Sequence, residues 1–274
     1  MGKTEKRAEC VMRLLEAKGR LSVSEAVEAL EISEATVRRL FALLEQEGKG
    51  VRSYGGIQLP QGLDGYSFDR YEKMQETEKR CIGVRAADLV ESGDSVYLDC
   101  GTTILRMAEE LKRRIATGAL TSLNIVTNSI ANVNVLAHVP GSRVILLGGE
   151  YNHERRDFSG FITEHCLEIF HFKRCFLGSE GFTVEAGFST NHLGLSSLCG
   201  KVIEKSDFAA VLMDKSKFGK AALVSYAKPA DVSAIVTDAL PEEALAEELA
   251  RLGVEIVLAG GKAPDSQSEG KGFA

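Results

Sequence analysis

Polar and basic side chains near the N-terminus are arranged like a surface that contacts DNA. They surround Val37, whose apolar side chain would face a core if this segment were helical, so that its neighbours would project outward. Arginines at the start of such a helix reach base edges and phosphates, and a serine at its N-terminus can meet a phosphate. An arginine in a following wing can reach a phosphate or the minor groove. The candidate DNA-contacting residues are Ser33, Thr36, Arg38, Arg39 and Arg52.

A second group of polar residues lies in turns that directly follow apolar runs later in the chain. Glycines there allow close backbone approach, and hydroxyls with free N–H groups at a helix N-terminus form an anion site. Lys215 offers a cation for a phosphate, and Asp99 or Asp214 can accept hydrogen bonds from hydroxyls. Each turn alone is typical of an ordinary tight turn, but their repetition favours a binding site. The candidate ligand-binding residues are Asp99, Gly101, Thr102, Thr103, Thr127, Asn128, Gly148, Gly149, Ser159, Gly160, Asp214, Lys215 and Lys217.

Three short helices are expected to position the first group. An apolar stripe over residues 8–15 predicts the first helix. Ser22 and Glu25 form a capping box that opens the second, and Ser33 caps the third. Two helices joined by a tight turn are typical of a helix-turn-helix, and residues 51–57 predict a strand and glycine turn that form a wing. Two arginines on a helix are most often a solvated face, but this pair directly follows the capped turn.

The rest of the chain alternates apolar runs with helical patterns, which indicates a mostly parallel sheet covered on both faces by helices. We therefore expect an α/β domain after an N-terminal winged helix-turn-helix of the α+β class. The predicted strands are residues 95–99, 124–127, 144–147, 175–178, 209–213, 233–237 and 255–258. The predicted helices lie near residues 78–91, 103–115, 129–137, 161–170, 193–206 and 242–252.

Charge differs between these two parts of the chain. The net charge of −6 argues against nucleic-acid binding only if the chain is taken whole, because residues 1–60 carry ten Lys/Arg and nine Asp/Glu. The acidity therefore belongs to the second part. We predict a DNA-binding domain at residues 1–58, a linker at 59–76, an effector-sensing and oligomerisation domain at 77–261, and a disordered tail at 262–274.

Composition narrows the function classes further. The sequence has no apolar run that could span a bilayer and no signal-peptide pattern, so we expect a cytoplasmic protein without a membrane partner. The six cysteines form no C-x-x-C pair, and we expect no metal and no cofactor. Most of these cysteines are interpreted as small buried side chains; Cys100, inside a polar turn, is the one for which a redox role is conceivable.

The order of these motifs resembles that of the DeoR family of bacterial sugar-metabolism repressors. The N-terminal resemblance rests on residues 30–39, residues 44–48 and the wing at residues 52–56. The chain departs from the family at Leu40, where the family has Asp, at Tyr54, where it often has His, and at Leu195-Ser196, which replace a Glu-Ala pair common in relatives. Leu40 falls three residues after Val37, so it is expected to extend the buried face of its helix.

The second part of the chain also resembles this family, through an ordered series of turns. Together with the N-terminal resemblance, it covers nearly all of residues 4–240. The matching turns are residues 79–83, 99–103, 126–129, 146–149, 158–160, 214–219 and 236–238. The resemblance implies a sensor domain folded like ribose-5-phosphate isomerase and the coenzyme A transferases. It implies a phosphorylated-sugar effector bound beside the turns at 99–103 and 214–217, whose binding releases a double-stranded DNA operator.

We therefore interpret the chain as a DNA-binding transcriptional repressor and not as an enzyme, active as a homo-oligomer (dimer or tetramer), since symmetric operators demand at least a dimer. Two alternatives stay open. One is a sugar-phosphate isomerase-like enzyme, in which Glu150, Glu180, Asp99 and Lys215 would transfer protons. The other is a constitutive DNA-binding regulator whose C-terminal domain senses nothing.

Overall fold

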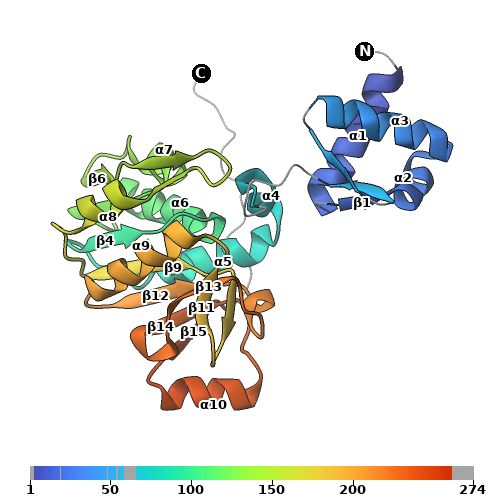
Figure 1. Cartoon of the computed structure of the whole chain (residues 1–274). Helices are drawn as coiled ribbons and strands as arrows, with labels where there is room; N and C mark the ends of the chain where they lie inside the picture. Colours follow the sequence, from blue (N-terminus) through green and yellow to red (C-terminus); the bar gives the residue numbers. More distant parts are fainter. Residues whose placement is uncertain (1–2, 19, 48, 54, 59–65, 261–274) are drawn as a thin grey trace. The chain divides into compact units, whose positions relative to one another are not determined.

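The chain forms two compact units, divided between Lys73 and Met74. The computed structural model describes residues 3–18, 20–47, 49–53, 55–58 and 66–260. Part of the predicted linker and the predicted tail at 262–274 lie outside the described residues, so the domain limits given above stay predictions. Each unit is described by itself below (Figure 1).

The N-terminal unit is a winged helix-turn-helix, as the sequence predicts. Its strands form an antiparallel sheet in the order β1-β3-β2. The wing is the pair β2 and β3, and the first strand, which the sequence pattern did not reveal, joins it on the other side. The elements are α1 (Lys3–Lys18), β1 (Arg20–Ser22), α2 (Val23–Leu30), α3 (Glu34–Gln46), β2 (Val51–Ser53), β3 (Gly56–Gln58) and α4 (Phe68–Lys73).

Local capping sets the boundaries of the two central helices of this unit. The backbone N–H of Glu25 donates to Ser22 Oγ at 3.2 Å while Ser22 N–H donates to Glu25 Oε2 at 2.9 Å, which confirms the predicted capping box. Thr36 N–H donates to Ser33 Oγ at 3.4 Å at the start of α3. Between them Glu31 adopts a left-handed conformation with φ of 50°, which reverses the chain in a tight turn.

The core of this unit explains why the wing packs onto the helices. Leu21 and Ile57 bring the strands into a core built from all three helices. Gly56 is required at the crossing, because a Cβ there would lie 2.5 Å from the carbonyl oxygen of Leu21. The fully or almost fully buried residues are Val11, Leu15, Leu21, Val23, Ala26, Val37, Leu40, Phe41, Leu44 and Ile57.

The C-terminal unit is built on a seven-stranded parallel sheet in the order β15-β14-β12-β9-β4-β5-β6. Each strand coincides with one of the seven predicted runs to within two residues at either end. The strands are β4 (Ser95–Leu98), β5 (Leu123–Thr127), β6 (Ser142–Leu146), β9 (Arg174–Gly178), β12 (Ala209–Leu212), β14 (Ala234–Thr237) and β15 (Glu255–Leu258).

Helices cover both faces of this sheet, and residues alternate between two cores along each strand (Figure 1). On β4, Val96 and Leu98 contribute to one core while Tyr97 lies in the other. The first core contains residues of α5, α6 and α7, and the second contains residues of α8, α9 and α10. The helices are α5 (Glu76–Ala87), α6 (Thr102–Ala116), α7 (Ile130–Leu136), α8 (Phe161–Leu167), α9 (Leu193–Glu204) and α10 (Glu243–Arg251).

Two small sheets are additions that the sequence pattern did not predict. One is the hairpin of β7 (Glu150–Asn152) and β8 (Asp157–Ser159). The other has the order β10-β11-β13, formed by β10 (Gly181–Thr183), β11 (Gly187–Thr190) and β13 (Val224–Ala227). The segment predicted as a linker also contains regular structure, since α4 lies within it. No helix in the described part of the chain is long and apolar enough to cross a membrane.

Candidate functional site

The candidate DNA-contacting arginines lie on exposed surfaces of the N-terminal unit. Arg38 and Arg39 are exposed on α3, and Arg52 is exposed on β2. Two of the three form ion pairs within the unit: Arg38 with Glu34 at 2.6 Å and Arg52 with Glu45 at 2.6 Å. These pairs sit in solvent and contribute little to stability, so a DNA phosphate can replace the carboxylate as the partner of each arginine.

The buried side of the same helix accounts for Leu40. Its side chain is 3% exposed and lies in the core with Val37 and Phe41. This confirms the expectation that Leu40 extends the buried face. An aspartate at this position would have to lose its hydration in an apolar core, so this chain positions its recognition helix with a hydrophobic contact.

Strand order identifies where a ligand can bind in the C-terminal unit. From β4 the chain proceeds outward through β5 and β6, and then returns to the other side of β4 at β9 before continuing to β12. The carboxyl ends of β4 and β9 therefore form the switch point, the position at which ligands bind in open parallel sheets. Asp99 follows β4 and Gly178 ends β9 at this point.

A hydrogen bond joins the two strand ends at the switch point. Asp99 Oδ2 accepts from the backbone N–H of Gly178 at 3.1 Å. The amide of Asn132 donates to the carbonyl oxygen of Asp99 at 2.9 Å and to Thr127 Oγ1 at 3.1 Å, so the turn after β5 is connected to the same position. All three polar side chains are buried, which means that their orientation is fixed by these contacts.

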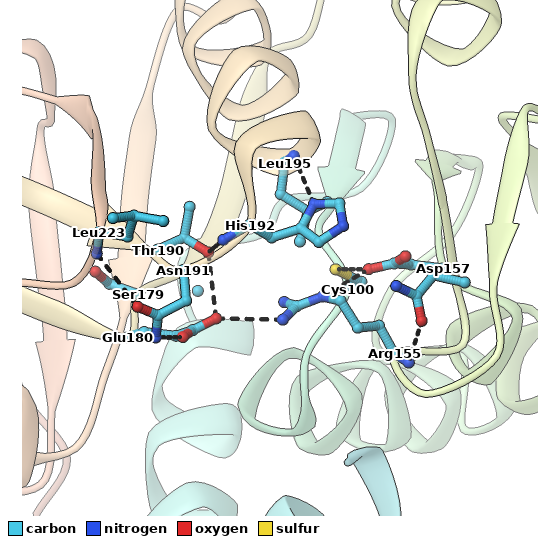
Figure 2. Close-up of polar contacts among 12 residues, drawn as sticks. Cys100, Arg155, Asp157, Ser179, Glu180, Thr190, Asn191, His192, Leu195 and Leu223 are labelled. Atoms are coloured by element: carbon cyan, nitrogen blue, oxygen red, sulfur yellow. Dashed lines mark hydrogen bonds and ion pairs between the residues drawn. The ribbon is translucent and has the colours of Figure 1, made fainter. Parts of the chain in front are cut away.

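The β7–β8 hairpin contributes charged side chains to the same place (Figure 2). Cys100 Sγ donates to Asp157 Oδ2 at 2.9 Å, and Arg155 Nε donates to the same oxygen at 3.2 Å. Arg155 also forms an ion pair with Glu180 Oε1 at 3.2 Å, just beyond the end of β9. Glu180 in turn accepts from Asn191 Nδ2 at 2.5 Å. A buried arginine therefore connects the hairpin to the strand on the far side of the switch point.

Burial changes the acid–base behaviour of this group of residues. It raises the pKa of Asp99 to about 6, although hydrogen bonds from the backbone N–H groups of Gly178 and Cys100 and the positive charge of Arg155 act in the opposite direction. Burial, reinforced by the carboxylates of Asp157 and Asp99, also holds the pKa of the Cys100 thiol well above its usual range. Cys100 is therefore a protonated hydrogen-bond donor, which disfavours the redox role considered from the sequence.

The structure brings most predicted ligand-binding residues to the edge formed by these strand ends. Gly101, with a φ of 129°, directly precedes α6 at the N-cap position, and Thr102, the first residue of the helix, is buried. Thr163 Oγ1 donates to the carbonyl oxygen of Gly148 at 2.9 Å, linking that turn to α8. The remaining residues of this region lie at or just after the ends of β4, β5, β6 and β8: Thr103 in the first turn of α6, Thr127 and Ser159 as the last residues of β5 and β8, and Asn128, Gly149 and Gly160 in the turns.

The turn after β12 lies at the same edge, with β9 between it and β4. Asp214 Oδ1 accepts from the backbone N–H of Ser216 at 2.9 Å, so this carboxylate caps a short 3₁₀ turn over Lys215–Lys217. The backbone N–H of Lys215 donates to Asp238 Oδ1 at 2.7 Å, and its side chain is exposed. The two lysines therefore belong to an ordered turn, with the Lys215 ammonium accessible to an anion.

Sequence reasoning missed several residues of this site. Asn132, Arg155 and Asp157 were not among the candidates, and neither was His192, whose Nδ1 accepts from the backbone N–H of Leu195 and so caps α9. The signal that could have found Arg155 and Asp157 is the group of charged residues between the turns at Gly149 and Gly160. Among the described residues, no three His, Cys, Asp or Glu side chains are grouped so that they could hold a metal ion.

Comparison with known protein families decides the identity of both units. The model of the DeoR-like helix-turn-helix domain matches residues 7–62, and the model of the DeoR C-terminal sensor domain matches residues 74–239. The chain belongs to the DeoR family. Its N-terminal unit makes it a DNA-binding transcriptional regulator, and its C-terminal unit is the family's sensor domain.

Curated DeoR relatives match along almost their whole length. The lactose phosphotransferase system repressor of Streptococcus mutans is 33% identical over 251 residues, which cover 88% of this chain and 94% of that protein. The transcriptional repressor GlcR of Bacillus subtilis is 30% identical over 97% of this chain and 98% of its own. These relatives are named as repressors, which favours the regulator interpretation over the isomerase alternative.

Solved structures of ribose 5-phosphate isomerase also align with part of this chain. The enzyme from Plasmodium falciparum aligns over 51% of this chain and 52% of its own with a TM-score of 0.38 and 16% identity. The one from Methanocaldococcus jannaschii aligns over 51% and 53% with a TM-score of 0.39 and 18% identity. The assignment to the α/β class rests on the observed seven-stranded sheet and not on these partial alignments.

Proposed function

We propose that this regulator represses carbohydrate-metabolism genes and is released from its operator by a phosphorylated sugar. The observation that carries the sensing half of the proposal is the gathering of buried polar side chains at the switch point between β4 and β9. Structural polar residues are seldom concentrated there, because burial of polar groups costs free energy that apolar side chains would avoid. The names of the curated relatives support the repressing half.

The effector's phosphate has two places to bind in this proposal. The turn at Gly101–Thr103 offers backbone N–H groups at the N-terminus of α6 with two threonine hydroxyls, which suit an anion. The exposed ammonium of Lys215, in the turn that Asp214 caps, is the second place. The sugar hydroxyls would then donate to Asp99 and Asp214, and the polar turns at Thr127, Asn128, Gly148, Gly149, Ser159, Gly160 and Lys217 would surround the rest.

Repression by a helix-turn-helix protein at a symmetric operator implies a homo-oligomer in the cytoplasm, a dimer or a tetramer. The contact residues proposed for each recognition helix and wing are Ser33, Thr36, Arg38, Arg39 and Arg52. The alternative of a constitutive regulator predicts that no sugar phosphate binds at all.

Thermal unfolding of the full chain tests the sensing claim. A cognate sugar phosphate at a hundredfold its Kd should stabilise the folded protein by about 2.7 kcal/mol, because it binds only the folded state. Lys215→Ala should abolish this stabilisation, and Lys112→Ala, which changes an exposed lysine on α6, should retain it. An unchanged shift in Lys215→Ala would remove Lys215 from the site, and no shift with any sugar phosphate would favour the constitutive alternative.

A further inference from the structure

At the switch point, several carboxylates surround the guanidinium of one buried arginine, Arg155. The side chain of Arg155 is 6% exposed and is shared by the carboxylates of Asp157 and Glu180, each at 3.2 Å. Asp99 is a third carboxylate at this position and is buried like Asp157, close enough for its pKa to be lowered by the charge of Arg155 and raised by that of Asp157. The Cys100 thiol is neutral. Among the contacts described at this position, three carboxylates therefore face the guanidinium of Arg155, and two of them, Asp99 and Asp157, are buried, so negative charge is in excess there.

The same cluster presents hydrogen-bond acceptors that have no donor. Asp99 Oδ1, Asp157 Oδ1, Asn128 Oδ1 and Asn132 Oδ1 are buried and accept no hydrogen bond from the described residues. The orientation of both amides is fixed, because Asn128 Nδ2 donates to the carbonyl oxygen of Phe158 and Asn132 Nδ2 donates to that of Asp99. Their oxygens are therefore the atoms left for a ligand. Buried acceptors without donors are rare in folded proteins and require a partner.

We propose that the effector places a protonated amine against Asp99, Asp157, Asn128 and Asn132, so that the effector is a phosphorylated amino sugar. The inference rests on the sugar-phosphate function proposed above and specifies its ligand. An ammonium group carries three donors and no acceptor, which complements a cluster of acceptors with excess negative charge. A hydroxyl would supply one donor and no charge.

The phosphate of the same effector must lie elsewhere. Its oxygens are acceptors and carry negative charge, so this cluster would repel them, whereas the Gly101–Thr103 turn and the Lys215 ammonium would attract them. The cluster and the anion-binding turn are adjacent, because Asp99, Cys100 and Gly101 are consecutive in the sequence. A sugar that carries an amine and a phosphate on different carbons can bridge the two places. The orientation follows: the amine lies against the carboxylates and the phosphate lies toward the helix N-terminus.

Matched ligands test the inference on the unmodified full chain. Isothermal titration at pH 7 would compare glucosamine 6-phosphate with glucose 6-phosphate, and galactosamine 6-phosphate with galactose 6-phosphate. The N-acetylated form of each amino sugar phosphate removes the positive charge but keeps the phosphate. We expect at least one amino sugar phosphate to bind about tenfold or more tightly than its hydroxyl partner, and acetylation to remove that advantage. A hydroxyl or N-acetylated partner that binds as tightly would overturn the inference.

A charge-removing variant assigns the preference to this cluster. Asp157→Asn keeps the shape of the side chain, and should reduce the affinity ratio within each ligand pair toward one. Asp207→Asn makes the same change at an exposed carboxylate that pairs with His171 and Lys173, and should leave the ratio unchanged. An unaltered ratio in Asp157→Asn would overturn the assignment. Circular dichroism checks that the variant folds; if it does not, the ligand series on the unmodified protein decides.

The outcomes separate this inference from the function on which it rests. If only the hydroxyl sugar phosphates bind, sugar-phosphate sensing stands and the amino-sugar inference fails. If none of the six compounds binds, the amino-sugar inference fails, and sugar-phosphate sensing fails only if no other sugar phosphate shifts the thermal unfolding of the chain.

Discussion

Cys100 Sγ lies 2.9 Å from Asp157 Oδ2 and donates a hydrogen bond to it, which joins the turn after β4 to the β7–β8 hairpin. The two residues are separated by 57 positions in the sequence, and both are buried. A ligand that contacts the turn would therefore also affect the hairpin. The same oxygen of Asp157 also accepts from Arg155 Nε, so displacement of any one of these residues changes the contacts of the others.

The reactivity of Cys100 follows from this contact. Its pKa is raised well above the ordinary value by burial and by the neighbouring carboxylates, and only the thiolate reacts quickly with alkylating reagents. We expect iodoacetamide at pH 8 to modify the exposed Cys10 and to leave Cys100 unmodified in the folded protein. Peptide mass spectrometry measures both sites, with urea-unfolded protein as the control in which both react. Equal labelling of the two cysteines in the folded state would contradict the buried, protonated thiol.

The raised pKa of Asp99 predicts a pH dependence of stability. The folded state binds this proton more tightly than the unfolded state, whose carboxyl has a pKa near 3.8. Its contribution to the free energy of unfolding is therefore largest at acid pH and is lost as pH rises through about 6. A difference of about two pKa units corresponds to about 3 kcal/mol.

Asp99→Asn isolates that contribution, since the variant lacks the titrating group. Urea unfolding would be measured at about pH 4.5, 6 and 8, which bracket the pKa of Asp99. The variant should gain stability relative to the unmodified chain as pH rises. Other carboxylates, such as Asp88, whose pKa is lowered by Arg114 and Arg85 despite burial acting in the opposite direction, titrate equally in both proteins and cancel in the difference. Curves that stay parallel across this range would show that Asp99 does not hold its proton as described.

Leu40 and Arg39 are neighbours on α3, but Leu40 packs in the core while Arg39 is exposed and is expected to contact DNA. Substituting each residue alone tests the two roles separately. Leu40→Ala should destabilise the N-terminal unit by about 2 to 4 kcal/mol, because it removes a buried side chain from a small core. Arg39→Ala should change stability by less than about 0.5 kcal/mol and should weaken DNA binding. Thermal unfolding and DNA titration measure the two effects. A stable Leu40→Ala variant, or an Arg39→Ala variant with full DNA affinity, would be inconsistent with these roles.

Glu34 is expected to oppose DNA binding. It pairs with Arg38 at 2.6 Å, and both side chains are 60% exposed, so the pair adds little to folding stability. Glu34→Gln should free the guanidinium for a phosphate and raise DNA affinity several-fold at low salt. Glu9→Gln on α1 makes the same change of net charge and serves as the control. Fluorescence anisotropy with a labelled DNA fragment measures both, and equal effects of the two variants would show that only net charge matters.

Particular residues show how far sequence reasoning reaches. The seven strands of the main sheet were predictable because strands buried on both faces are continuous apolar runs, as in Ala209–Leu212. Ser22 and Glu25 gave the start of α2 because a capping box is a local pattern. The strands β10 and β11 were missed because each is only three or four residues long and begins with glycine.

The candidate site was predictable only where its residues follow strands. Asp99 and Gly101 were found because a polar turn directly follows an apolar run. Arg155 was missed because its role depends on Glu180, which is 25 positions away and comes into contact only through the fold of the hairpin onto the strand end. The imbalance of charge is likewise a property of the assembled cluster, which no single motif contains.

The measurement that tests the central claim most directly is a DNA titration with and without effector. DNA fragments would be taken from the regions upstream of the genes that neighbour the gene of this protein. Each fragment would be titrated with the full chain at several salt concentrations. If a dimer uses Arg38, Arg39 and Arg52 from each subunit, the slope of log affinity against log salt should be about −5, and a saturating sugar phosphate should weaken binding. A flat salt response, or no binding to any upstream fragment, would contradict the account of this chain as an effector-controlled repressor.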